Sequence, residues 1–240
     1  MKNQCKSKHL FYVLCLLLTA FSSYAQNDVK WHVYELDKLS LNEPGVYVDT
    51  PTISGKTYVT KSATTLKASS YDRMLFIVEG MCTATVKSEA MNLKTGDVVF
   101  LKADDAIKFS GSLKTMIWTS KSTKTNHQNK TKKFSKAEIE AERDASENVW
   151  NSFIETSTMV AGLYMLPKSL NGDNTLTHSF DEINYVVNGS AKFKMNDTVI
   201  DVKPGSMMWV KRGVGHYFYD LSADFDVFIL FETINMDHDH

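Results

Sequence analysis

Three residues in the C-terminal part of the chain have side chains that could together bind a metal ion. His178 and Glu182 stand in the spacing H-x3-E, and His216 follows on a later segment. Two imidazoles and one carboxylate are the ligand set of non-haem Fe(II) sites, and the same set accepts other divalent metals. We therefore expect one divalent metal ion here, and the residues leave its identity open among Fe, Mn, Ni and Zn.

These side chains can converge only if strands position them. Residues of equal parity on a strand face the same side, so Leu176, His178 and, across a bend, Glu182 can line one interior. His216 would arrive from a later strand. Four residues on the predicted pocket strands are candidates for substrate binding, although strand aromatics also commonly belong to a core: Asn184, Trp209, Phe218 and Tyr219.

The rest of the sequence is dominated by short β-strand patterns. Segments of β-branched or aromatic residues alternate with turn-forming residues, and no helical period precedes residue 135. Several short strands at this spacing favour an all-β sandwich or barrel. The clearest strand segments are Trp31–Tyr34, Gly45–Val48, Lys56–Val59, Met74–Val78, Asp97–Leu101 and Thr115–Trp118.

The strand-rich pattern occurs twice. Gly80 and Gly96 recur as Gly189 and Gly205, and both are displaced by 109 residues. The order of strand, glycine turn, strand, glycine turn and strand is shared between the two copies. Duplication of one small β-barrel explains this repeat.

The second copy resembles the cupin superfamily, whose motifs are commonly written G-x5-H-x-H-x3,4-E-x6-G and G-x5-P-x-G-x2-H-x3-N. It keeps the spacings H-x3-E-x6-G and G-x7-G-x2-H at His178, Glu182, Gly189, Gly205, Gly213 and His216. The resemblance implies two cupin-type, jelly-roll-like β-barrels joined by a linker and one short helix. It also implies that the metal ligands are those of the second barrel.

The sequence departs from the cupin motifs at three positions. Leu176 stands where the first histidine should be, Lys211 replaces the motif proline, and Asp220 replaces the final asparagine. Leu176 removes a donor and either opens a substrate position or marks a site that is going out of use. In the first copy the ligand positions carry no metal-binding set, which predicts a degenerate barrel with a structural or dimerising role: Lys67, Ser69, Arg73 and Ile107.

The organisation of the chain follows from these patterns. A basic start, an apolar run and small residues before Gln26 predict a cleaved signal peptide, and thus a periplasmic or secreted protein. Ser135 and Glu138 have the spacing of a capping box and predict a helix that starts there. The expected parts are a signal peptide at 1–25, a first barrel at 26–120, a linker and helix at 121–158, a second barrel at 159–236 and a tail at 237–240.

Composition limits the partners. The chain has 240 residues, of which 43% are apolar and 23% charged, and its formal net charge of −1 gives no basic excess for nucleic acid. After signal cleavage Cys82 is the remaining cysteine, so no internal disulfide is expected. We expect a small-molecule substrate, no nucleic acid and no membrane contact after cleavage, and we leave a homodimer open.

Three functions are compatible with these residues. The first is an exported metal-dependent cupin enzyme with isomerase-type or lyase-type chemistry, acting on a small polar substrate such as a sugar acid released from a polysaccharide. The second is a non-catalytic ligand-binding or structural bicupin, and the third is an Fe(II) dioxygenase. No residue is assigned as a catalytic acid or base.

Overall fold

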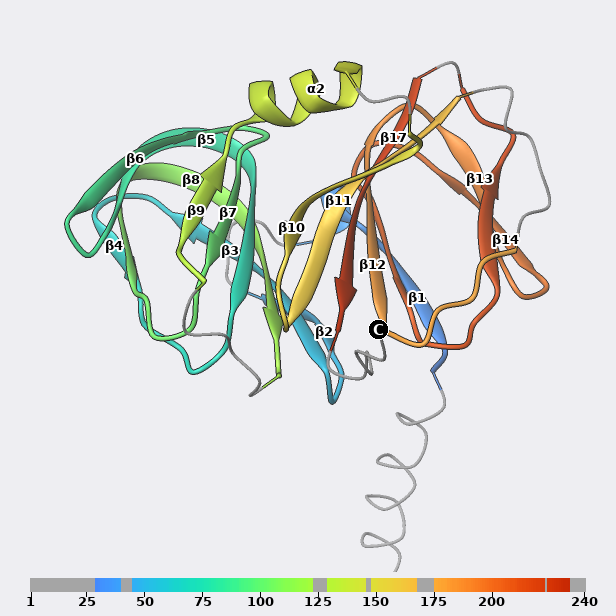
Figure 1. Ribbon diagram of the computed structural model, residues 1–240, viewed down its shortest axis with the longest axis horizontal. Coiled ribbons are helices and arrows are strands. Elements are labelled where there is room, and N and C mark those ends of the chain that lie inside the picture. The colour runs from blue at the N-terminus through green and yellow to red at the C-terminus, as the bar shows by residue number, and fades with distance from the viewer. Residues whose placement is uncertain are drawn as a thin grey trace, which may run out of the picture.

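The short strand patterns fold into two β units that pack side by side (Figure 1). The computed structural model describes residues 29–39, 45–122, 129–145, 148–167, 175–222 and 224–233. The predicted signal peptide at 1–25 and the tail at 237–240 lie outside these residues. Within the described ranges, no helix is long and apolar enough to cross a membrane. The structure is predominantly β, as the sequence predicts.

The first unit is an eight-stranded sheet in the order β2-β3-β8-β5-β7-β9, with β4 paired to β8 and β6 paired to β5. Two long strands, β5 and β8, pair along their whole length and carry the other strands at their two ends. The strands are β2 (Gly45–Asp49), β3 (Ile53–Thr60), β4 (Thr64–Leu66), β5 (Arg73–Val86), β6 (Glu89–Lys94), β7 (Val98–Leu101), β8 (Ile107–Ser120) and β9 (Lys132–Phe134).

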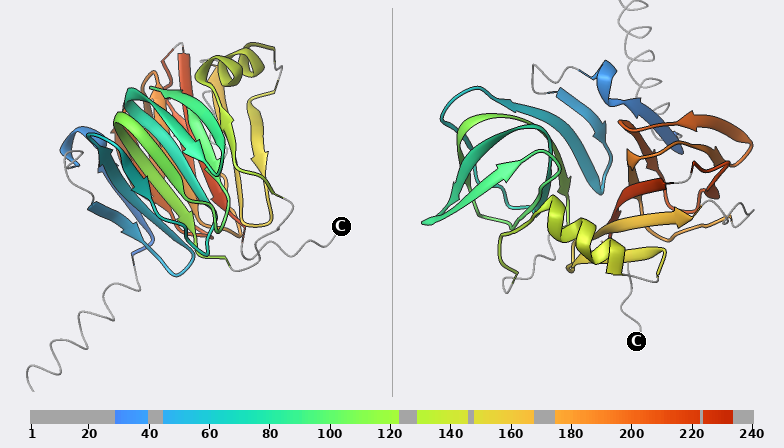
Figure 2. Two further views of the ribbon diagram at one scale, coloured as in Figure 1. Left: turned by 90° about the vertical axis from the view of Figure 1, so that its left-hand side faces the viewer. Right: turned by 90° about the horizontal axis from the view of Figure 1, so that it is seen from above.

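The second unit consists of a six-stranded sheet in the order β1-β15-β12-β17-β11-β10 and a three-stranded sheet in the order β14-β13-β16. The strands are β1 (Trp31–Glu35), β10 (Trp150–Glu155), β11 (Met159–Pro167), β12 (Glu182–Asn188), β13 (Ala191–Met195), β14 (Thr198–Val202), β15 (Ser206–Val210), β16 (His216–Tyr219) and β17 (Asp224–Glu232). Seen from above, both units are strongly curved, and each encloses its own interior (Figure 2).

The repeated glycines occupy equivalent bends in the two units. Gly80 has φ +98° within β5, and Gly189 has φ +72° between β12 and β13. A Cβ atom at Gly80 would lie 2.4 Å from the carbonyl oxygen of Ser112, and one at Gly189 would lie 1.9 Å from that of Asp224. Only glycine fits both this backbone conformation and this close approach. The glycine spacing in the sequence therefore reports a real structural equivalence.

The two units exchange one edge strand each. The strand that precedes the first unit in the chain pairs with the second unit, and the strand that precedes the second unit pairs with the first. β1 lies within the range predicted for the first barrel, but it pairs with β15 of the second unit. β9 precedes the second unit in the chain and pairs with β7 of the first. Sequence patterns identify a strand but not its partner, so the exchange was not predicted. The two units therefore share strands as well as a common surface.

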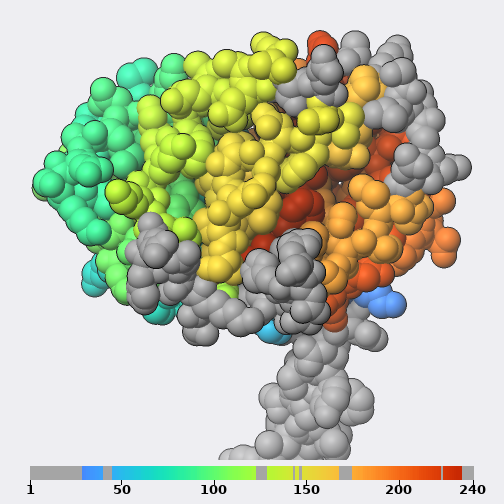
Figure 3. All heavy atoms as spheres, in the orientation of Figure 1, coloured from blue at the N-terminus to red at the C-terminus, as the bar shows by residue number. Residues whose placement is uncertain are grey.

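The helix α2 (Lys136–Ala145) lies across the top of the two units (Figure 1). Its start is the predicted capping box: the Glu138 backbone N–H donates to Ser135 Oγ at 3.2 Å, and the Ser135 backbone N–H donates to Glu138 Oε2 at 2.7 Å. A 3-10 turn, η1 (Leu36–Lys38), follows β1 in the corresponding place. Figure 3 shows β10 and β11, in yellow, filling the surface between the green first unit and the orange and red second unit.

Three separate hydrophobic clusters stabilise this arrangement. One fills the interior of the first unit, one fills the interior of the second, and the third lies between them. Alternate residues of one strand serve two clusters, as in β15, where Met208 faces the second interior and Met207 faces the shared cluster. In the shared cluster the rings of Trp118 and Phe228 stack at 5.5 Å, and Phe76 meets Tyr185 edge-on at 5.0 Å.

Removal of one ring from the shared cluster should destabilise the whole chain. Phe228 is 1% exposed and contacts aromatic rings of both units. We expect Phe228→Ala to lower the free energy of unfolding by about 3–5 kcal/mol, because it leaves a cavity at a fully buried position. Val199→Ala, at a residue 44% exposed, is the control. Chemical denaturation measures both, and a loss for Phe228→Ala no greater than the control's would contradict this assignment.

Candidate metal centre

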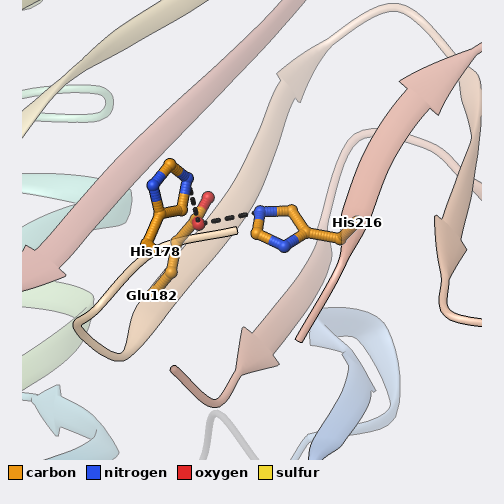
Figure 4. A group of neighbouring side chains, drawn as sticks. All are labelled: His178, Glu182 and His216. Carbon is orange, nitrogen blue, oxygen red and sulfur yellow. Dashed lines mark ion pairs between the residues drawn. The ribbon is translucent and has the colours of Figure 1, made fainter. Parts of the chain in front are cut away.

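Three segments of the second unit bring the predicted ligand residues together. Glu182 is the first residue of β12, His216 is the first residue of β16, and His178 lies in the segment that leads into β12. Leu176 pairs with His216 through two backbone hydrogen bonds, which fixes that segment beside β16. Figure 4 shows the two imidazole rings pointing toward the carboxylate of Glu182 from two different directions.

The distances within this trio suit a metal ion. Glu182 Oε2 lies 2.9 Å from His216 Nε2 and 3.4 Å from His178 Nε2. One ligand atom from each residue can be chosen so that all three lie within 4.8 Å of one another. Two ligands at about 2.1 Å from one metal ion lie about 3.0–3.4 Å apart at right or tetrahedral angles. Within the described residues this is the one group of three such side chains.

The buried carboxylate of Glu182 lacks a conventional partner. Its side chain is 4% exposed, and Oε2 receives no hydrogen bond of acceptable geometry from the described residues, although His216 Nε2 is close. The other nitrogen of His216, Nδ1, lies 2.8 Å from the carbonyl oxygen of Val214. A carbonyl only accepts, so Nδ1 carries a proton, and Nε2 presents a lone pair toward Glu182 when the ring is neutral, as a metal ligand must be. A cation between these groups would satisfy both.

The two histidines differ in their electrostatic surroundings. Burial lowers the pKa of His178, and this effect outweighs the nearby charge of Glu182. Burial also opposes protonation of His216, but the carboxylate of Glu182, 2.9 Å from Nε2, favours the charged ring and raises its pKa. The side chain of His178 is 23% exposed, against 5% for His216. His178 is therefore the ligand on the open side of the site, and it stays neutral as metal binding requires.

A cavity of about 300 Å³ opens over the trio and is walled mainly by apolar and aromatic side chains. The ring of Phe180 stacks on His178 at 5.0 Å, and the edge of Phe231 meets Phe180 at 4.7 Å. The phenol of Tyr164 has a raised pKa through burial and the charge of Glu182, so it remains a hydrogen-bond donor. The lining is Trp150, Tyr164, Leu166, Leu176, His178, Phe180, Glu182, His216, Tyr217, Phe218, Ile229 and Phe231.

Comparison with known proteins identifies the fold. Residues 175–228, which contain the whole trio, match the family described as AraC-like ligand binding domain. An uncharacterised protein of Streptomyces coelicolor is 34% identical over 100 residues, which cover 42% of this chain and 94% of that protein. The chain belongs to the same family as this Streptomyces protein.

Solved structures extend the comparison to both units. A cupin 2 conserved barrel domain protein from Leptotrichia buccalis has a TM-score of 0.62 at 13% identity, over 79% of this chain and 88% of that one. A salicylate 1,2-dioxygenase from Pseudaminobacter salicylatoxidans has a TM-score of 0.66 at 11% identity, over 85% and 84%. Ylba from E. coli has a TM-score of 0.65 at 12% identity, over 85% and 90%. The chain has the cupin fold.

The cupin interior contains only part of the substrate set predicted from the sequence. Phe218 lines the cavity. Trp209 lies outside that interior: it faces the shared cluster between the units, while Met208 and Val210 face the interior. Tyr219 lies on the face of β16 opposite to that of Phe218, with its ring beside that of Tyr217 in a tilted arrangement at 5.6 Å.

Asn184 lies in the cupin interior but not on the cavity wall. It is fully buried on β12, on the same face as Glu182, and neither polar atom of its amide has a hydrogen-bond partner among the described residues. Its cross-strand neighbours are Met208 and Ile229, and Ile229 lines the cavity. Asn184 therefore belongs to the layer beneath the cavity.

Several cavity residues were not predicted from the sequence. Phe180 could have been predicted, because it is two residues from His178 and shares its parity. Trp150, Tyr164 and Phe231 come from strands distant in sequence, and only the pairing of β10, β11 and β17 assembles them. Their strand patterns do not distinguish a cavity wall from a core.

Among the described residues, the first unit has no metal-ligand group at the equivalent place. Arg73 takes the position of Glu182, and its guanidinium donates to the carbonyl oxygens of Lys67 at 2.8 Å and Asp105 at 2.7 Å. Ile107 takes the position of His216, and Leu66, rather than the expected Lys67, faces it as Leu176 faces His216. The guanidinium group of Arg73 thus occupies the region of the first unit that corresponds to the metal-ligand trio of the second unit.

Leu176 offers a direct test of the geometry. Its side chain lines the cavity beside His216 at the place of the missing motif histidine. We expect Leu176→His to add a fourth ligand and to raise the affinity for Zn²⁺ about tenfold or more, measured by competition with a chelator. Leu176→Asn, similar in size but a poorer ligand, is the control. Equal affinities in the wild type and Leu176→His would show that position 176 does not face the metal.

Proposed function

We propose that this chain is a cupin metalloenzyme with one active centre, formed by His178, Glu182 and His216 of the second unit. The observation that carries the proposal is the buried carboxylate oxygen of Glu182, which faces two imidazole nitrogens and receives no suitable hydrogen bond from the described residues. Two histidines and one carboxylate leave coordination positions open on the cavity side. Such a metal, when bound, supplies a Lewis acid or a site for O₂ chemistry.

The cavity supports a substrate with a compact apolar or aromatic body. Rings of Trp150, Phe180 and Phe231 would enclose that body, and the open side of the metal centre would receive a carboxylate or hydroxyl group. The Tyr164 hydroxyl is placed to donate a hydrogen bond to the same polar group. A sugar acid does not suit this lining, because its many hydroxyl groups would find few polar partners.

Among the reactions considered from the sequence, an Fe(II) oxygenase suits this centre better than an isomerase or a lyase. The ligand set with open positions is that of non-haem oxygenases, and the apolar walls exclude water from the reacting groups. The salicylate dioxygenase among the structural neighbours supports this choice at the level of the fold alone. Oxygen consumption by the Fe(II)-loaded protein with a panel of small aromatic carboxylates would test it.

Metal content is the primary test. We expect the purified full chain to hold about one metal ion, and Glu182→Gln, His178→Ala and His216→Ala each to lose it, because each removes one of only three protein ligands. His32→Ala is the control, since His32 is exposed on β1 and lies outside the trio. Elemental analysis measures the content. A wild-type protein that neither retains metal nor binds it in titration would disprove the centre.

The second candidate is a ligand-binding protein without catalysis. The match of residues 175–228 to an AraC-like ligand binding domain favours it, as does the apolar Leu176 at a ligand position. In that case an aromatic carboxylate would bind in the cavity and be recovered unchanged, with no uptake of O₂. Turnover of any panel substrate would favour the enzyme instead.

We also propose that the chain is exported and is a bicupin whose first barrel has lost its metal centre. Export rests on the signal pattern in residues 1–25, and the bicupin assignment rests on the glycine repeat and the matched strand orders. The exported protein should begin at Gln26, which its intact mass would establish. An N-terminus retained in full would contradict the signal cleavage.

A further inference from the structure

The carboxylate of Asp181 links the metal centre to its surroundings. Asp181 is 4% exposed and directly precedes Glu182 in the chain. Its Oδ1 accepts hydrogen bonds from the backbone N–H of Arg212 at 3.0 Å and from Arg212 Nε at 3.3 Å. Its Oδ2 accepts a hydrogen bond from Thr52 Oγ1 at 2.9 Å. One buried side chain therefore holds three parts of the molecule together.

The loop held by Asp181, residues 211–214, contacts both histidines through its backbone. Gly213, next to Arg212, donates its backbone N–H to the carbonyl oxygen of His178 at 2.8 Å. The carbonyl oxygen of Val214 lies 2.8 Å from His216 Nδ1 and sets the orientation of that ring. A shift of Asp181 would thus move Glu182 directly, and both histidines through the 211–214 loop.

Thr52 belongs to the other unit. It lies in the turn between β2 and β3, and its carbonyl oxygen accepts the backbone N–H of Lys121 at 2.8 Å, also in the first unit. The hydrogen bond from Thr52 to Asp181 therefore connects the first unit to the metal centre of the second unit.

An equivalent contact runs in the other direction, from the second unit to the first. The described residues around it include no group of metal ligands. Thr158 of the second unit donates to Asp72 Oδ2 of the first at 2.7 Å, and Ala103 N–H donates to Asp72 Oδ1 at 2.7 Å. Asp72 precedes Arg73 as Asp181 precedes Glu182. The two contacts share their chemistry and a buried carboxylate, although Thr158 is fully buried and Thr52 is half-buried. They differ in what they support.

We propose that Thr52 is a positioning residue through which the first unit sets the metal affinity of the second. The inference rests on the proposed metal centre. Loss of the Thr52 hydroxyl leaves a buried, charged oxygen of Asp181 short of a donor, and the carboxylate then moves toward water or another donor. Groups that orient metal ligands from outside the coordination sphere typically affect metal affinity about 10–100-fold when they are changed.

The experiment compares matched variants of the full chain. Thr52→Val removes the hydroxyl at nearly constant side-chain shape, and Thr52→Ser keeps a hydroxyl. Thr158→Val removes the hydroxyl at the equivalent contact between Thr158 and Asp72. Each metal-free protein is titrated with Co²⁺, and the visible absorption bands report both affinity and coordination geometry. Thermal unfolding of the metal-free proteins reports general stability.

We expect Thr52→Val to weaken Co²⁺ binding about tenfold and to alter the absorption bands, because Glu182 and the 211–214 loop lose their fixed orientation. Thr158→Val should lose at least as much thermal stability, because Thr158 is the more deeply buried of the two, but it should bind Co²⁺ as the wild type does. Thr52→Ser should restore both affinity and spectrum.

Two results would overturn the inference while leaving the metal centre intact. One is Thr52→Val that binds Co²⁺ with wild-type affinity and spectrum. The other is an equal loss of affinity in Thr52→Val and Thr158→Val, which would reflect the stability of the interface rather than positioning. A wild-type protein that binds no Co²⁺ would instead refute the metal centre itself, and the inference with it.

Discussion

The structure depends on two sheets that are buried on both faces. Strands such as β7 and β15 send alternate side chains into a unit's interior and into the cluster between the units. Each sheet is therefore part of two cores at once, and hydrophobic burial on one face fixes the register on the other. The ligand trio depends on this constraint, since Glu182 faces inward only because Ile183 and Tyr185 are held in the shared cluster.

The metal centre interrupts that packing with buried polar groups. Oε2 of Glu182, a residue whose side chain is 4% exposed, and the fully buried amide of Asn184 lie in a largely apolar interior without hydrogen-bond partners in the described part of the chain. Buried polar groups are costly unless they are satisfied, and such exceptions are concentrated at functional sites. The first unit meets this cost in part at the equivalent position, because Arg73 donates from its two terminal nitrogens to backbone carbonyl groups while its Nε has no partner among the described residues.

The sequence predicted the fold class, the capping box of α2 and the convergence of the trio, because these depend on local patterns or on fixed spacings. Phe218 lines the cavity, whereas Trp209 faces the shared cluster. All five residues of β15 are buried, so their pattern does not show which face is the interior. Trp150 and Phe231 were missed because their meeting at 5.5 Å depends on strand pairing across the sheet. The exchange of β1 and β9 was missed for the same reason.

The exchanged edge strands have a consequence for how the two halves can diverge. A swapped pair of separate, identical chains would carry every substitution twice, so a change at one pocket would also change the other. Here one covalent chain contributes both halves, and the tether keeps them paired at any protein concentration. Arginine can therefore stand at position 73 while glutamate stays at position 182. Because the two halves are linked covalently, the first can change in sequence and lose metal ligands while it still packs against and stabilises the second.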